Sequence, residues 1–292
     1  MAWILSAFAD EAGESTDEQI AALNRAGIDH IDPRSVDGHN IVELPVDLAR
    51  QVKARYDQAG IRVNMYGSPI GKIDIADDFQ TDVKRLEHLA KMRDVFGSNK
   101  VRIFSYYNND GAPEADWKAE STKRLIELAK LADKLDLVLY HENEKHIFGD
   151  YVRNVAVLRD EVHASHSERF KMIFDFDNYN QSGEDVWAAW QELRDTTEAI
   201  HLKESMRQAD GSYQHVPAGT GDGRVPEVLQ DAAERGFDGP LTLEPHLAHS
   251  AAVMATGPSG QANQSLKDMS PADCFQVAAD HAINLIKQVG KR

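Results

Sequence analysis

Short apolar, β-branched segments alternate with longer segments of helical periodicity along almost the whole chain. The segments expected as strands are residues 3–9, 30–36, 62–69, 100–107, 136–143, 170–177, 198–205 and 239–246. Each is followed by an expected helix, at residues 16–26, 45–59, 78–96, 113–134, 151–161, 184–193, 225–235 and 271–289. Eight consecutive strand–helix units predict an α/β fold, a single-domain (β/α)8 TIM barrel over residues 1–292.

Glycines support the expected helix ends. The tripeptides AGI (26–28 and 59–61) and RGF (235–237) each place a glycine after a helix and an apolar residue at the next strand. A doubly wound open sheet is the alternative, but no G-x-G-x-x-G motif follows the first strand. Residues 248–269, rich in Ala, Gly, Ser and Asn, predict an inserted loop over the site or at an oligomer contact.

The composition of the chain limits the kinds of partner and the cellular location to expect. The net charge of −16 repels phosphate backbones, so we expect no nucleic-acid partner. No apolar run is long enough for a membrane span, and the N-terminal segment lacks the basic region of a signal peptide. The single cysteine, Cys274, cannot form an intramolecular disulfide. These features predict a cytoplasmic protein that binds a small molecule.

Polar residues stand at the ends of four successive expected strands, where barrel enzymes carry their active sites. They are Glu142, then Asp175 and Asp177, then His201, Lys203 and Glu204, and last Glu244 and His246. Three carboxylates and an imidazole at one rim repel each other unless a cation lies between them. The pattern therefore predicts one divalent metal, and the oxygen-rich set favours Mn²⁺, Mg²⁺ or Co²⁺ over Zn²⁺.

Each of these residues also has an ordinary structural explanation. A glutamate after a strand, such as Glu142, is usually a solvated loop residue. Asp175 could cap a helix, and His201 could be a hydrogen-bonded core histidine. Glu244, which precedes Pro245, could belong to a turn. Their joint placement on four consecutive strands favours the metal site.

Several short motifs resemble the sugar phosphate isomerase/epimerase family, the xylose-isomerase-like TIM barrels. They are VDG (36–38), GSPIGK (67–72), HENEKHIFGD (141–150), FDFDNYNQ (174–181), HLKE (201–204), VPAGTGDG (216–223) and LEPHL (243–247). The resemblance implies that Glu142, Asp175, His201 and Glu244 hold one divalent metal, with Mn²⁺ as first choice. It also implies that Glu142 and Glu244 move the proton, one on each face of the substrate.

The activity implied is isomerisation or epimerisation of a keto-sugar, or a related polyol or sugar phosphate, through an enediolate. The residues expected to contact substrate are Arg34, Lys72, His141, Lys145, Asn178, Lys203 and His246. The chain departs from the usual family pattern in three places. Asn178 and the pair Glu144–Lys145 stand where many relatives have histidines, and Lys203–Glu204 replaces Lys–Asp. These departures leave the substrate open.

Three other functions remain open at this stage. One is a metal-dependent lyase or dehydratase acting on a keto-sugar or inosose, and another is a non-catalytic sugar-binding accessory subunit. An abasic-site endonuclease is disfavoured, because it needs a three-zinc cluster with more histidines and a basic face. The segment PAGTGDG (217–223) is expected as a plain turn rather than a phosphate site, since Asp222 would oppose an anion. Relatives are often dimers or tetramers, so a homo-oligomer is expected.

Overall fold

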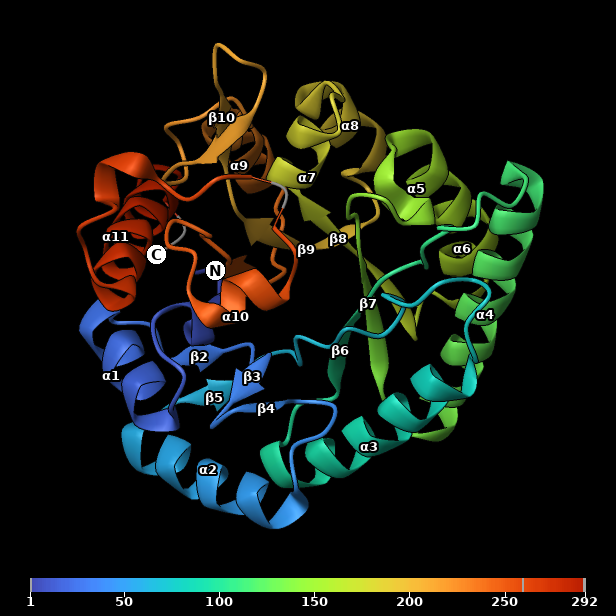
Figure 1. The fold of residues 1–292 in the computed structure, drawn as a ribbon, viewed down its shortest axis with the longest axis horizontal. Coiled ribbons are helices and arrows are strands. Elements are labelled where there is room, and N and C mark those ends of the chain that lie inside the picture. The colour runs from blue at the N-terminus through green and yellow to red at the C-terminus, as the bar shows by residue number, and fades with distance from the viewer. Residues whose placement is uncertain (1, 259, 291–292) are drawn as a thin grey trace.

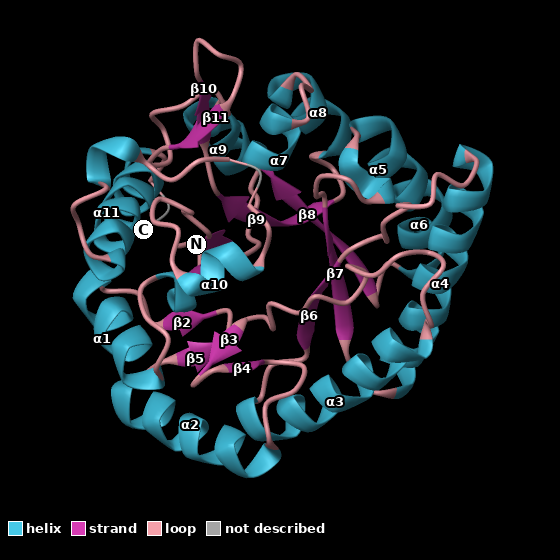
Figure 2. Ribbon diagram, viewed as in Figure 1, coloured by secondary structure: helices cyan, strands magenta, loops and turns pink. Residues whose placement is uncertain are grey.

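The computed structural model describes residues 2–258 and 260–290. In it the chain forms one α/β barrel, with strands inside and helices around them (Figures 1 and 2). The inner strands are β1 (Leu5–Ala7), β2 (His30–Ile31), β5 (Arg62–Val63), β6 (Lys100–Ile103), β7 (Val138–Glu142), β8 (Phe170–Asp175), β9 (Thr197–Leu202) and β12 (Leu241–Leu243). Seven of the eight lie within the expected strands, and β9 begins one residue earlier than expected, so the predicted TIM barrel is confirmed.

The inner strands are joined in parallel. Six of them form a sheet in the order β1-β12-β9-β8-β7-β6, and β2 pairs with β5. Backbone hydrogen bonds link these two groups: the Asp32 N–H donates to the Ala7 carbonyl (2.9 Å), and the Tyr66 N–H donates to the Lys100 carbonyl (2.9 Å). The barrel is therefore closed, and the carboxyl ends of its strands meet at one mouth.

The outer helices follow the sequence pattern closely. They are α1 (Thr16–Ala26), α2 (Val46–Ala59), α3 (Gln80–Phe96), α4 (Glu114–Lys134), α5 (Val152–Leu158), α8 (Val186–Leu193), α9 (Val225–Glu234) and α11 (Pro271–Gln288). Local chemistry sets their ends. Ser15 and Glu18 form a capping box at the start of α1, and Gly27 ends it in the left-handed conformation (φ 67°). No helix in the described ranges is long and apolar enough to cross a membrane.

Several short elements follow the carboxyl ends of the inner strands and surround the mouth. They are η1 (Ala9–Glu11), the hairpin of β3 (Ser35–Val36) and β4 (His39–Asn40), η2 (Phe148–Asp150), α7 (Phe176–Gln181), the hairpin of β10 (Ser205–Arg207) and β11 (Tyr213–His215), α10 (Ala251–Ala255) and η4 (Gln264–Leu266). The π-helix η3 (Arg159–His163) and α6 (Ala164–His166) instead continue α5 and lead into β8 at the other end of the barrel. The expected strand 170–177 stops early because the Asp175 side chain accepts the Asn178 N–H and starts α7. Helix α10 comes from the expected loop 248–269 and lies over the mouth (Figure 1).

Strand alternation decides which side chains enter the barrel. On β7, Tyr140 faces inward and packs with Met65 and Ile173, so Glu142 on the same face also points inward. Leu139 and His141 point outward toward the helices. This alternation places Glu142 at the mouth as soon as the apolar part of the strand is buried.

Candidate metal centre

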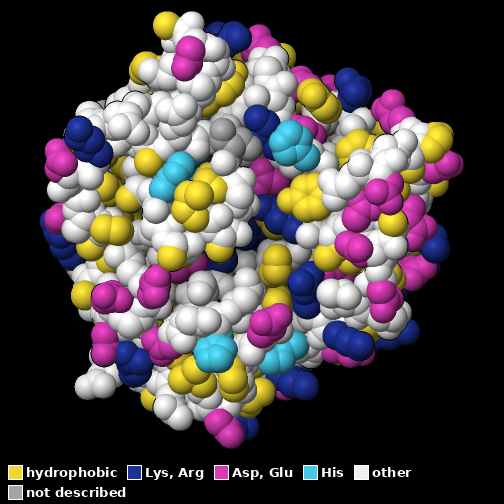
Figure 3. Space-filling view, viewed as in Figure 1, with side chains coloured by type: hydrophobic (Ala, Val, Ile, Leu, Met, Phe, Trp, Pro, Cys, Tyr) yellow, Lys and Arg dark blue, Asp and Glu magenta, His cyan; other side chains and the backbone are white. Residues whose placement is uncertain are grey.

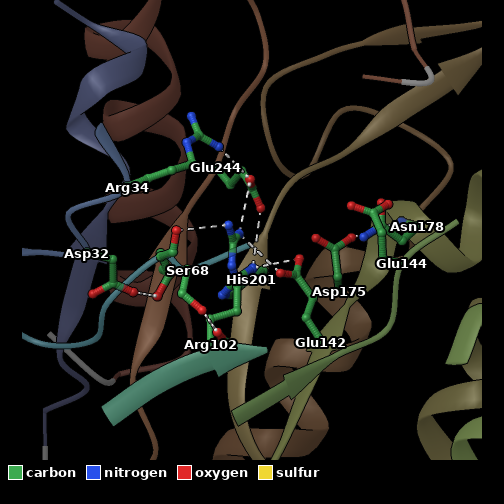
Figure 4. A network of polar contacts seen from close by, with 12 residues as sticks. Asp32, Arg34, Ser68, Arg102, Glu142, Glu144, Asp175, Asn178, His201 and Glu244 are labelled. Atoms are coloured by element: carbon green, nitrogen blue, oxygen red, sulfur yellow. Dashed lines mark hydrogen bonds and ion pairs between the residues drawn. The ribbon is translucent and has the colours of Figure 1, made fainter. Parts of the chain in front are cut away.

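Four side chains from four neighbouring elements converge at the mouth (Figure 4). They are Glu142, Asp175, His201 and Glu244, and all four are buried. One ligand atom from each lies within 4.8 Å of the other three. Glu142, Asp175 and His201 lie on β7, β8 and β9, and Glu244 directly follows β12. The structure thus brings together the complete set of metal ligands that the sequence predicts.

The geometry fits a cation. His201 Nδ1 lies 2.9 Å from Glu142 Oε1 and 3.3 Å from Glu244 Oε2. Among the described residues, no well-aligned hydrogen bond reaches the buried oxygens Asp175 Oδ2 and Glu244 Oε2, although Lys203 Nζ lies 3.2 Å from the first. Buried carboxylate oxygens need close cations or donors, and a divalent ion would satisfy both oxygens at once. These four residues would hold it.

Two guanidinium groups lie against the same carboxylates. Arg102 Nη1 is 3.2 Å from Glu142 Oε2 and 3.6 Å from Glu244 Oε1. The Arg102 guanidinium lies 4.7 Å from the ring centre of Phe8 and 4.9 Å from that of Phe104. Arg34 Nη1 is 3.0 Å from the same Glu244 oxygen. Glu244 therefore shares its charge between both guanidinium groups.

Counting charges supports a divalent ion. The mouth cluster, as we call it, has five buried carboxylates linked by ion pairs to three buried cations. The carboxylates are Asp10, Glu11, Glu142, Asp175 and Glu244, and the cations are Arg34, Arg102 and Lys203. If His201 is neutral, as a metal ligand must be, two negative charges stay uncompensated. One divalent cation would balance them.

Without a metal, the cluster gains positive charge through protons. Burial lowers the pKa of His201, but the charges of Glu142 and Glu244 outweigh burial and raise it to about 10. Burial raises the pKa of Asp175 well above its usual range and that of Glu11 to about 8. Burial alone would also raise the pKa of Glu142, but the positive charges of His201 and Arg102 outweigh it and lower that pKa to about 2. Protons on His201, Asp175 and Glu11 would thus reduce the negative charge of the cluster.

Five of the seven predicted substrate contacts lie near the mouth. Arg34 and Lys72 line a large cavity, and Lys72 Nζ pairs with Glu144 Oε2 at 2.8 Å. The other three, Asn178, Lys203 and His246, line a much smaller one. Lys203 Nζ lies 3.2 Å from Asp175 Oδ2, and His246 Nε2 lies 3.5 Å from Glu244 Oε1. These positions keep the five side chains available for a substrate role.

The other two predicted contacts lie elsewhere. Strand alternation turns His141 out of the barrel, where its Nε2 lies 3.0 Å from Ser105 Oγ and its ring stacks on Phe170. Burial lowers its pKa to about 3, so His141 is neutral and packs outside the barrel, and the geometry gives the expected substrate contact no support at this position. Lys145 is half-buried; the contact found for it is its backbone N–H donating to Glu144 (2.9 Å). Its proposed role has no support from the geometry.

Three members of the mouth cluster were missed. Asp10 and Glu11 follow β1, so the strand-end criterion that found Glu142 should have found them too. Asp10 holds Arg34 in a two-point ion pair, with Nε and Nη2 at 2.9 and 3.0 Å. Arg102 lies inside a strand between Val101 and Ile103. The sequence feature that could have identified Arg102 is a charged residue between two apolar residues of a strand.

The loop 216–223 binds one of the protein's own carboxylates. Glu204 accepts the backbone N–H groups of Gly219, Thr220, Gly221 and Gly223 at 2.6–3.1 Å. A Cβ atom on Gly221 would lie 2.8 Å from Glu204 Cγ, which explains the glycine there. The N–H groups that could bind a phosphate are occupied, in agreement with the expected turn.

The family follows from comparison with known proteins. A family model described as xylose isomerase-like TIM barrel matches residues 20–269. The chain belongs to this family. No curated protein matches the sequence.

Several solved structures share the fold at low sequence identity. D-psicose 3-epimerase with D-tagatose, from Clostridium cellulolyticum H10, is 14% identical with a TM-score of 0.69, covering 98% of this chain and 99% of that one. The probable 3-DHS dehydratase AsbF from Bacillus anthracis is 17% identical with a TM-score of 0.71, covering 97% and 99%. A xylose isomerase-like TIM barrel protein from Mycobacterium smegmatis, in complex with magnesium, is 16% identical with a TM-score of 0.67, covering 96% and 98%.

Proposed function

We propose that this protein is a divalent-metal-dependent isomerase or epimerase that moves a proton next to the carbonyl of a keto-sugar. The observation that carries the proposal is the buried set of Glu142, Asp175, His201 and Glu244, whose ligand atoms lie within 4.8 Å of one another. Membership of the xylose isomerase-like family supports it, as do the epimerase and the magnesium complex among its structural neighbours. Mn²⁺ stays our first choice of metal.

A divalent ion held by these four residues would polarise the substrate carbonyl and stabilise the negative charge of an enediolate. The protein's own carboxylates would move the proton. Glu142 and Glu244 reach the centre from β7 and β12, and their pKa values lie below the usual range, so both are ionised at neutral pH. An ionised carboxylate can accept the substrate's proton. If the same carboxyl group returns this proton to the neighbouring carbon, and the hydroxyl proton passes to the carbonyl oxygen, the carbonyl shifts. Inversion needs a donor on the opposite face, so the second carboxylate would first take up a proton from solvent and then donate it to the carbon, while the first keeps the proton that it accepted.

Arg102 and Lys203 would keep the two carboxylates in place during this transfer. Arg102 contacts both, and Lys203 Nζ lies 3.9 Å from Glu244 Oε2. Both cations are buried and already held in place by the carboxylates, so they need not reorient when substrate binds. A sugar as partner, a cytoplasmic location and a dimeric or tetrameric assembly stay predictions of the sequence.

The test is solvent exchange. The Mn²⁺-loaded protein is mixed with a panel of keto-sugars in D₂O, and deuterium incorporation is followed by NMR. We expect incorporation at a carbon next to the carbonyl, with loss of exchange in Glu142→Gln and Glu244→Gln. The structural similarity to the dehydratase AsbF makes loss of water a second outcome, and a dehydrated keto-sugar in the same spectra identifies it. If no keto-sugar exchanges with any divalent metal, the proposal is wrong.

A further inference from the structure

A cavity of about 620 Å³ opens above the mouth cluster. Arg34 and Arg102 line it, and both lie against Glu244 at its inner end. Figure 3 shows this face hollowed near its centre, with Lys and Arg side chains in the depth of the hollow. The cavity extends outward from there to Lys72 and to helix α10.

The volume exceeds what proton transfer on one sugar ring needs. Pockets that bury drug-sized ligands have volumes of about 300–1,000 Å³. Glu142 and Glu244 do not line this cavity, but Arg34 and Arg102, which line it, contact them, so the end of the cavity at these two guanidinium groups adjoins the proposed proton carriers. Most of the space therefore lies farther out, beyond the ring that reacts.

The walls of this outer space differ in character. Ala251, Ala252 and Ala255 of α10 give one wall small apolar side chains. Ser35 and Asn40, from the β3–β4 hairpin, give another wall hydroxyl and amide groups. An apolar surface opposite hydrogen-bonding groups suits a flat ring with polar edges, such as a second sugar or an aromatic group.

The charges in the cavity disfavour an anion. Each of its three lining cations already has a carboxylate partner: Lys72 pairs with Glu144, Arg34 with Asp10, and Arg102 with Glu142. Asp10 itself also lines the cavity. A phosphate would have to compete with these carboxylates, and one bound divalent ion would leave the mouth cluster without surplus positive charge.

We infer that this cavity is a subsite for a neutral second unit of the substrate, so that the enzyme acts on a keto-sugar glycoside rather than on a free monosaccharide or a sugar phosphate. The inference rests on the proposed function for the chemistry at the inner end of the cavity. The subsite itself rests on the cavity's size, the walls and the paired cations.

Three related compounds test the inference: a 3-keto-hexose, its phenyl glycoside and its phosphate ester. Deuterium incorporation from D₂O is measured for each with the Mn²⁺-loaded protein. We expect kcat/KM for the phenyl glycoside to exceed that of the other two by about tenfold or more, as for filling an apolar pocket. Fastest exchange of the phosphate ester or of the free keto-hexose would overturn the inference.

A pair of variants on α10 locates the effect. Ala252→Trp fills the subsite, whereas Met254→Trp changes the same helix at an exposed position (56%) that does not line the cavity. We expect Ala252→Trp to slow exchange of the phenyl glycoside about tenfold and to leave the free keto-hexose nearly unchanged, with Met254→Trp like the parent. Equal slowing of both compounds by Ala252→Trp would show an access route instead of a subsite and overturn the inference.

A binding measurement distinguishes failure of this inference from failure of the proposed function. If no keto-sugar of the panel exchanges with any divalent metal, the proposed function fails, and calorimetry with the phenyl glycoside still decides the subsite. Binding to the parent that weakens about tenfold in Ala252→Trp but not in Met254→Trp supports the subsite. No binding to the parent, or equal binding to all three proteins, overturns it.

Discussion

Replacing Arg102 by Met tests the charge balance of the mouth cluster. The Met side chain keeps apolar contact with Phe8 and Phe104 but removes the positive charge beside Glu142 and Glu244. Taking one partner from a buried ion pair costs about 3–5 kcal/mol of stability. In the metal-free protein we therefore expect the Tm to fall by about 10 °C. The pKa of Glu142 should also rise, because Arg102 lowers it.

A divalent metal should reverse this loss. Without Arg102 the cluster carries one more negative charge, so it attracts a cation more strongly. A unit charge about 5 Å from the ion contributes about 3 kcal/mol per unit of ion charge at an effective dielectric constant of 20. We therefore expect saturating Mn²⁺ to raise the Tm of Arg102→Met by at least about 5 °C more than it raises that of the parent.

The assay is differential scanning calorimetry with and without Mn²⁺. Arg124→Met is the matched control, because Arg124 is also buried and lies over two rings, of Phe79 and Tyr106, but donates to Ile75 and Asp77 carbonyls away from the mouth. Its loss of stability should not depend on Mn²⁺. Equal Mn²⁺ effects on the two variants would refute the charge balance.

Other predictions concern the loop, the strand ends and pH. Glu204→Ala should lower the free energy of unfolding, measured with urea, by about 3 kcal/mol or more, because four N–H groups lose their acceptor. Glu204→Gln should lower it less. A Glu204→Ala protein as stable as the parent would contradict these hydrogen bonds. Gly67→Ala should cost about 1–3 kcal/mol in the same assay, since a Cβ there would lie 2.5 Å from the Phe8 ring; an unchanged midpoint would rule this out. His141 is neutral in the fold, with a pKa of about 3 against 6.5 ordinarily, so its contribution to folding stability is complete above pH 6.5 and falls as the pH drops toward 3. Between pH 7 and pH 5, His141→Gln should therefore lose less stability than the parent protein. An equal loss in both proteins would show that His141 does not cause the pH dependence. Mn²⁺ binding at pH 7 should release protons in weakly buffered solution, because burial and neighbouring charges leave His201 with a pKa of about 10 before it binds a metal; no acidification would argue against it as a ligand.

The barrel and the convergence of Glu142, Asp175, His201 and Glu244 could be predicted. Alternating strands and helices set the fold, polar residues at the carboxyl ends of the strands reach the mouth, and the family resemblance singled out these four among them. Strand ends were less certain. The expected strand 170–177 became α7 after Asp175, since Oδ1 of that side chain caps the helix while Oδ2 lies 3.2 Å from Lys203 Nζ in the cluster.

Contacts between distant segments could not be read from the pattern. Arg102 faces Phe8 from another strand, and Glu204 accepts N–H groups 15–19 residues later in the chain. Such partners depend on the closed barrel rather than on local spacing. The expected substrate contact of His141 has no support from the fold for a different reason: His141 adjoins the candidate ligand Glu142 in sequence, yet it points to the other side of the strand.

Equilibrium titration with Mn²⁺, with the free ion followed by electron paramagnetic resonance, tests the central claim that Glu142, Asp175, His201 and Glu244 form one metal site. Asp175→Asn removes a ligand, whereas Asp82→Asn changes a buried carboxylate that pairs with Arg85 away from the mouth. We predict one Mn²⁺ per chain in the parent and in Asp82→Asn, and loss of most of the affinity in Asp175→Asn. No Mn²⁺ bound by the parent, or equal affinity in Asp175→Asn, would contradict the account.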